Sequence, residues 1–192
     1  MRSTSILVLG SIFLVGANTY AQFTPGNVVI STLADPSATH GSAIELREYD
    51  PNGNAALTVT LPTTGADRIF GAGSSFSGAL NAHPAANALV ITGYGDPAPV
   101  GTLLRNTDAA TNARVVGTVD HFGTFTRQAS SNVLFSGRAI HAACTDGTQF
   151  WAVGDSGGVA YFGPGPQTMV AGTNAALSTV KVVNDQLMAS VI

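Results

Sequence analysis

The chain is poor in charge and in cysteine. Charged residues make up 10% of its 192 residues and the formal net charge is −3, so the sequence predicts no basic surface for nucleic acid or anionic lipid. A single cysteine, Cys144, excludes an intramolecular disulfide, and the fold must depend on its hydrophobic core. Cys144 ends the apolar segment 139–144, "AIHAAC", which predicts a small buried side chain rather than a reactive thiol.

Long apolar runs are missing except near the N-terminus. Residues 6–17, "ILVLGSIFLVGA", follow the basic start Met1-Arg2, and Thr19 and Ala21 stand where a signal peptidase reads small or uncharged residues. We therefore predict a signal peptide over 1–21 and a secreted protein, extracellular or periplasmic. A retained membrane anchor is the alternative, although the apolar run is short for a membrane span.

Helical periodicity is nearly absent from the predicted mature chain, residues 22–192, which we expect to form one domain. Turn signals built from Gly, Pro, Asp and Asn recur at short intervals. Runs rich in β-branched and aromatic residues lie between them, and in "LTVTL" the apolar and polar residues alternate. The fold class predicted is all-β. The expected strands are 27–32, 43–49, 56–61, 88–94, 114–119, 150–154, 158–162 and 180–183.

An internal repeat decides the architecture that the sequence predicts. Segments 76–95 and 135–154 both begin with Phe-Ser-Gly, cross a polar turn and end in an apolar strand with glycine. The same apolar strand recurs near the mature start and at the end of the chain. Its first apolar residues are Val28, Leu89, Phe150 and Leu187.

A second repeated element follows the first. Segments 44–53 and 114–123 each form a strand ending in Asp-x-x-Gly, and 158–166 occupies the third such place. Each unit then has roughly four strands, which is typical of a β-propeller blade. We expect about two and a half to three blades, and hence the front part of a longer propeller.

The chain resembles secreted bacterial β-propeller-repeat proteins of uncharacterised function. The resemblance rests on "FTPGNVVIST" after the leader, on the block "FSG…GTQFWAVGDSGGVAYF" and on the Asp-x-x-Gly strand ends. It implies a propeller-like fold and export, and it carries over no catalytic residues. The function expected is a non-catalytic binding or surface-associated scaffold with no cofactor.

The segment 154–158, "GDSGG", suggests a different function. This motif surrounds the nucleophile of trypsin-like serine proteases, and the candidate triad would be Ser156, His40 and Asp96. The flanking residues depart from that family, because His40 precedes Gly41 and Asp96 precedes a proline. The repeat predicts a glycine-rich turn here, with glycines at positive φ. The protease remains the alternative function.

Aromatic residues provide the candidate ligand-binding site. Trp151, Tyr94 and Tyr161 flank the glycine turns and could stack on a sugar ring or hold a peptide. Phe150 alternates with Trp151, so the two side chains should face opposite ways. A carbohydrate-binding module is therefore a third functional hypothesis.

The four histidines show no metal-ligand spacing, and we predict no metal site. Asp50, Asn52 and Asp120 lie in turns that lack the further carboxylates of a calcium loop. The expected partner is an extracellular protein or glycan, with self-association possible if the chain is complete.

Overall fold

The computed structural model describes residues 22–73, 77–155, 157–163, 165–172 and 175–191. The predicted signal peptide, 1–21, lies outside the described residues. The described chain contains fourteen strands and two short 3-10 turns, Pro84–Ala86 and Leu104–Asn106, so the all-β prediction is confirmed. Among these residues, no helix has the length and apolar character needed to cross a membrane.

The strands fall into four sections, of which the first holds three antiparallel strands. Strand β2 pairs with β1 on one side and with β3 on the other. Alternate residues of β2 are buried, including Ile44 and Leu46. In β3, Leu57 and Val59 are less exposed than Thr58 and Thr60, as the alternating pattern predicts. The bounds are Val28–Leu33 for β1, Ser42–Tyr49 for β2 and Ala55–Thr60 for β3.

The second section is a four-stranded meander in which β5, β6, β7 and β8 pair in chain order. A two-residue strand, β4, bridges β2 and β6, so the first two sections belong to one eight-stranded sheet by hydrogen bonding. The bounds are Phe70–Gly71 for β4, Asn81–His83 for β5, Ala88–Tyr94 for β6, Arg114–Asp120 for β7 and Phe125–Ser131 for β8.

The third section is a second four-stranded meander, β9 to β12, and the fourth is the hairpin β13–β14. Among the described residues, β1 and β14 each pair with a single neighbour. The bounds are Ile140–Thr145 for β9, Phe150–Gly154 for β10, Val159–Tyr161 for β11, Thr168–Ala171 for β12, Leu177–Val183 for β13 and Gln186–Val191 for β14.

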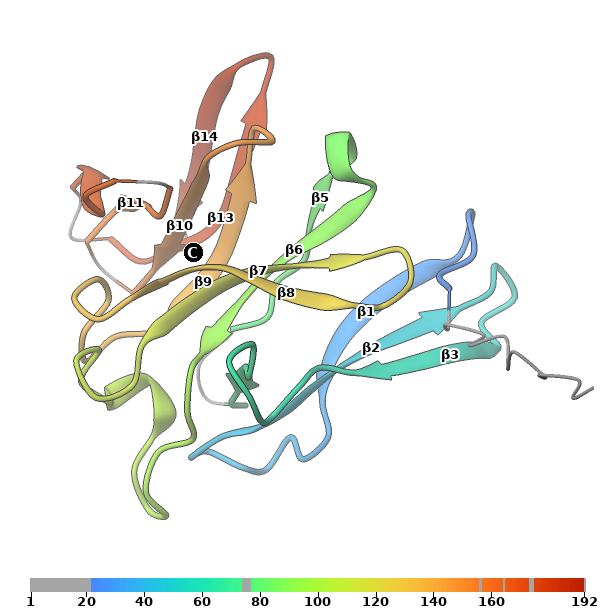
Figure 1. The fold of residues 1–192 in the computed structure, drawn as a ribbon, viewed down its shortest axis with the longest axis horizontal. Coiled ribbons are helices and arrows are strands. Elements are labelled where there is room, and N and C mark those ends of the chain that lie inside the picture. The colour runs from blue at the N-terminus through green and yellow to red at the C-terminus, as the bar shows by residue number, and fades with distance from the viewer. Residues whose placement is uncertain (1–21, 74–76, 156, 164, 173–174, 192) are drawn as a thin grey trace, which may run out of the picture.

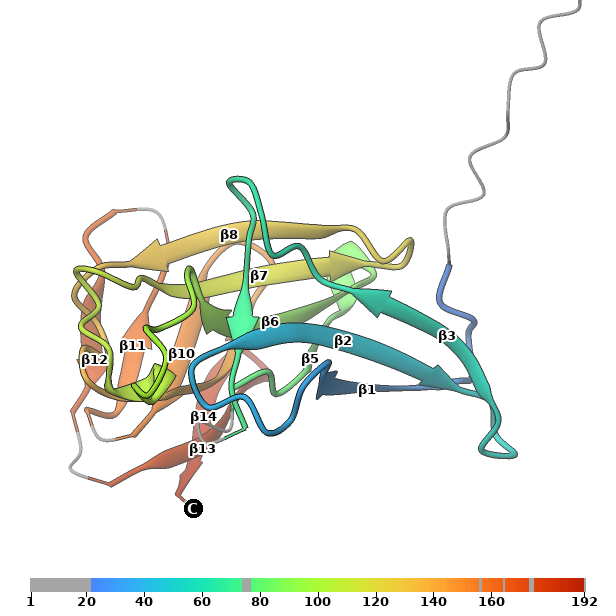
Figure 2. The ribbon, with the colours of Figure 1, turned by 90° about the horizontal axis from the view of Figure 1, so that it is seen from below.

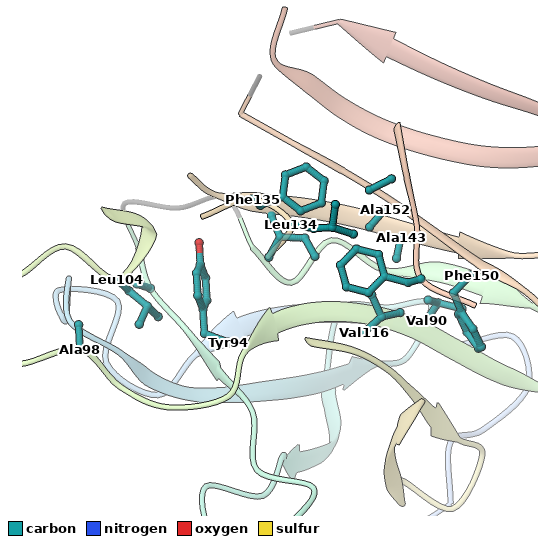
Figure 3. Close-up of a cluster of buried hydrophobic side chains, with 14 residues drawn as sticks. Val90, Tyr94, Ala98, Leu104, Val116, Leu134, Phe135, Ala143, Phe150 and Ala152 are labelled. Atoms are coloured by element: carbon teal, nitrogen blue, oxygen red, sulfur yellow. The ribbon is translucent and has the colours of Figure 1, made fainter. Parts of the chain in front are cut away.

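Consecutive sections pack face to face over three hydrophobic clusters. In Figure 1 the sections follow one another from the red β13–β14 hairpin to the blue and cyan strands β1–β3. Figure 2 shows the same series turned by 90°. Between the second and third sections, Val90 and Val116 face Ala143, Phe150 and Ala152 (Figure 3). This burial of apolar side chains between sheets is the main stabilising contribution to the fold.

The two Asp-x-x-Gly segments fold alike. At the β2–β3 turn, Asp50 Oδ1 accepts hydrogen bonds from the backbone N–H groups of Asn52 and Asn54, at 2.9 and 2.8 Å. At the β7–β8 turn, Asp120 Oδ1 accepts them from Phe122 and Thr124 at the same distances. The aspartates thus close Asx turns. This role accounts for the Asp and Asn residues whose spacing resembles that of calcium ligands.

The glycines of the apolar strands differ from their predicted role. Gly157 and Gly158 do take positive φ, at 105° and 88°, but Gly93 and Gly154 do not. A Cβ at Gly93 would lie 2.6 Å from Phe70 O, and one at Gly154 would overlap Ala139 O. These two strand positions need glycine because another backbone approaches closely, not because the chain turns there.

Candidate functional site

A cleft of about 420 Å³ lies between the segment that precedes β1 and the second section. One wall is this segment, residues 22–27, and the other is formed by the β5–β6 hairpin and the end of β7. Its lining residues are 22–27, Val29, Ala82, His83, 87–89 and 119–121.

Hydrogen bonds to two partners hold the first wall in place. The backbone N–H of Phe23 donates to His121 O at 2.8 Å. Glu48 Oε1 accepts from the backbone N–H of Thr24 at 2.5 Å and from Asn27 Nδ2 at 3.1 Å. Glu48 is almost fully buried on β2, so its carboxylate is a strong, fixed acceptor for the segment. The cleft wall is therefore built into the fold.

The floor of the cleft is apolar and its rim is polar. Val29, Leu89 and Val119 belong to, or pack against, the core between the first two sections. At the rim stand Asn87, whose φ is 47°, and His121, whose ring lies 3.8 Å from that of Phe122 between centroids. An apolar floor with a few polar groups at its edge suits a small apolar or amphipathic group.

The predicted aromatic ligand residues lie outside this cleft and do not form one surface. Tyr94 is fully buried in the core between the second and third sections (Figure 3). Trp151 and Tyr161 are half-buried neighbours on β10 and β11, with ring centroids 6.3 Å apart. Trp151 packs toward β13 and β14, whereas Phe150 packs toward the second section, so the two side chains do face opposite ways.

The structure places two of the three protease candidates. Ser156 lies outside the described residues, and the GDSGG segment joins the antiparallel strands β10 and β11. Both carboxylate oxygens of Asp96 accept from Arg68, at 2.8 and 3.0 Å. His40 lies near the segment that carries Asp96, because the backbone carbonyl of His40 accepts a hydrogen bond from the N–H of Ala98. The Asp96 carboxylate thus forms a salt bridge with Arg68 rather than a contact with a histidine side chain.

The structure also brings together two side chains that sequence reasoning did not pair. His141 Nε2 on β9 lies 3.0 Å from Asp155 Oδ1, and its Nδ1 lies 2.8 Å from Leu177 O. Both ring nitrogens of His141 therefore face oxygen atoms. The pair joins β9 to the end of β10 and to β13. The signal was missed because the partners lie on neighbouring strands rather than at a fixed spacing on one strand.

The described part of the chain holds no cluster of side chains that could bind a metal ion. Groups of three or more His, Cys, Asp or Glu residues are absent from it. Cys144 is buried as predicted, and burial raises the pKa of its thiol to about 12. The thiol is therefore a packing group at neutral pH.

Comparison with known proteins identifies no relative of this chain. No protein-family model matches the sequence, and comparisons with curated proteins and with solved structures give no significant match.

Proposed function

We propose that this chain is an exported, non-catalytic binding scaffold built from propeller-type sections, and that the 420 Å³ cleft holds its ligand. The cleft carries the binding proposal, because its volume and its apolar floor match those of small-ligand sites. An apolar side chain of an extracellular peptide or the apolar face of a glycan would fit it. The wall fixed by Glu48 would meet such a group without much reordering.

A second cavity, of about 260 Å³, supports the propeller-type arrangement. Its lining includes Asn81, Cys144 and Lys181. These three residues lie on the first strands of three hairpins and hold matching places there, since their partners on the second strands are Val90, Trp151 and Met188. Ala82, Thr145 and Val182 line it as the next matching set. Equivalent positions of successive inner strands converging on one space is what stacking around an axis would produce.

The ligand proposal is tested by filling the cleft. Ala82 is exposed and lines it, so Ala82→Trp should occupy the space without disturbing the core. Ala86→Trp is the matched control, since Ala86 is exposed in the same hairpin and does not line the cleft. The probe is indole, titrated into the mature chain and followed by amide ¹H–¹⁵N spectra.

We expect indole to shift the amide signals of Asn27, Asn87 and His121 in the unmodified chain and in Ala86→Trp. Ala82→Trp should lose these shifts. The cleft proposal is wrong if indole causes no shifts at millimolar concentration, or if Ala82→Trp responds like the unmodified chain.

Export is tested by the mass of the protein recovered outside the cytoplasm of an expressing bacterium. The proposal requires a mature chain that starts at Gln22. Recovery of the full-length chain in the membrane fraction would contradict it and would favour a retained anchor.

The Trp151–Tyr161 pair favours a second candidate function, carbohydrate binding. Two neighbouring aromatic rings, each half-buried, can present a face to a sugar. Trp151 is the only tryptophan of the chain, so its emission reports this site alone. Saturable quenching by one member of a glycan panel would support this function, and unchanged emission across the panel would exclude stacking on Trp151.

A further inference from the structure

The first and last sections each carry an outer sheet face that nothing in the described chain covers. We name the outward side of β1 and β2 the head face, with residues Val28, Ile30, Thr32, Glu45, Arg47 and Tyr49. The outward side of β13 and β14 is the tail face, with residues Thr179, Lys181, Val183, Gln186, Met188 and Ser190. The two faces lie at opposite ends of the series of sections (Figure 1).

Residues in matching places inside the chain are buried. Ile30 corresponds to Ile91 and Ala152 in the second and third sections, which are both fully buried against the section before them. On the head face, Ile30 is 44% exposed and Val28 is 58% exposed. The head face thus has the apolar positions of an inner interface without its covering sheet.

The tail face shows the complementary situation. Met188 corresponds to Val90 and Trp151, which pack against the section that follows them. Met188 itself is 54% exposed. At every inner interface, the side of one section that faces the next section meets the side of that next section that faces back. In the described chain, the head face and the tail face are one uncovered side of each kind.

We propose that a second copy of this chain covers these faces, with the tail face of one copy seated on the head face of the next. A second copy supplies the surface that the three inner interfaces already use as a template. The contact is heterologous, because two different surfaces meet. Two copies bring together eight sections, which lies within the range of closed propellers.

Charge on the head face makes the contact a reversible one. Glu45 and Arg47, which form an ion pair of 2.8 Å, stand where Val115 and Gly117 stand in the matching strand β7. A face that carries ions is soluble when uncovered, unlike the inner interfaces. Lys181 adds a positive charge to the tail face, opposite in sign to Glu45 on the head face.

The test is the mass of the mature chain in solution, measured by sedimentation velocity over a range of concentrations. Ile30→Glu blocks the head face and Met188→Glu blocks the tail face. Val133→Glu is the control, because Val133 is 78% exposed and belongs to neither face. All three positions are at the surface, and urea unfolding of each variant checks that it is folded.

We expect the unmodified chain and Val133→Glu to associate as concentration rises, and each face variant to remain monomeric. An equal mixture of Ile30→Glu and Met188→Glu should double in mass, since each keeps the face that the other has lost. A monomeric unmodified chain overturns the inference. So does a monomeric mixture beside an associating unmodified chain, because that result indicates a symmetric contact.

The inference rests on the propeller-type arrangement of the proposed function, but its failure is separable from that of the ligand proposal. Ile30 and Met188 do not line the cleft. Indole binding by a chain that stays monomeric would remove the head-to-tail contact and leave the ligand site in place.

Discussion

The guanidinium carbon of Arg114 lies 4.7 Å from the centre of the Tyr94 ring, and both side chains are fully buried. The guanidinium donates hydrogen bonds to Thr107 Oγ1 and to a set of backbone carbonyls. These carbonyls belong to Arg105, Thr107, Asn112, Phe135 and Arg138. Burial lowers the pKa of the guanidinium from its usual value. One arginine thus joins the connections that follow β6 and β8.

We predict that Arg114→Met destabilises the fold by about 3 kcal/mol or more, since several buried carbonyls lose their donor. Arg114→Lys should recover only part of the loss, because an ammonium cannot reach both ends of the carbonyl set. The measurement is the free energy of unfolding in urea. Arg138→Met is the control, because that side chain is exposed. Equal effects of Arg114→Met and Arg138→Met would contradict the role of Arg114.

Acid should destabilise the protein through its turn carboxylates. The side chain and backbone of Asn54 hold the pKa of Asp50 below 3.8, and backbone N–H groups do the same for Asp108 and Asp146. A carboxylate whose pKa is lower in the folded than in the unfolded chain stabilises the fold. This stabilisation is complete at pH values above the unfolded-state pKa, and it is lost as the pH falls through the folded-state pKa. The urea midpoint should therefore be level from about pH 7 to 5 and fall below about pH 4.

Asp50→Asn is the matched variant for this prediction. The amide oxygen that replaces the Asp50 carboxylate can still accept from the backbone, so the turn should persist while one titrating group is removed. The urea midpoint of the variant should fall less steeply below about pH 4 than that of the unmodified chain. An identical slope would show that the Asp50 carboxylate does not contribute.

Cys144 should resist thiol reagents in the folded protein. Its thiol is buried between the third and fourth sections and its pKa is about 12, so little thiolate forms near neutral pH. Iodoacetamide labelling, followed by mass spectrometry, should be slow in buffer and rapid in concentrated urea. Rapid labelling of the folded chain would indicate that the β13–β14 hairpin opens readily and uncovers the thiol.

Two glycines in matching strand places should not tolerate alanine. Gly93→Ala and Gly154→Ala would each push a methyl group into neighbouring backbone, at a cost of about 1 to 3 kcal/mol. Gly172→Ala is the control, because a Cβ there meets nothing within 4 Å. Urea unfolding of the three variants checks this, and equal stabilities would show that the backbone relaxes freely.

A fluorophosphonate probe separates the scaffold from the protease. We expect no labelling that depends on Ser156, which lies outside the described residues. Labelling of the unmodified chain that Ser156→Ala abolishes would establish an activated serine and replace the scaffold proposal. Heat-denatured protein provides the baseline for non-specific reaction.

Local sequence patterns predicted most of the strands, the two Asp-x-x-Gly turns and the burial of Cys144. Every predicted strand corresponds to an observed one, because short alternating runs between Gly, Pro and Asx turns leave few other local structures. The two Asp-x-x-Gly turns were identified for the same reason, since an aspartate two residues before the free N–H groups can cap them locally. Chemistry contained within a few residues can be deduced from the chain.

Which side chains meet between strands was decided by the packing of the folded chain. The stacking of Tyr94 on Arg114, the contact between His141 and Asp155 and the support of the cleft by Glu48 all join residues of different strands or segments. No spacing encodes these contacts, because the register and the stacking of sheets bring the partners together. The close backbone approach at Gly154 depends on Ala139 in the same way. Local periodicity fixes which face of a strand is buried, and only packing decides what that face meets.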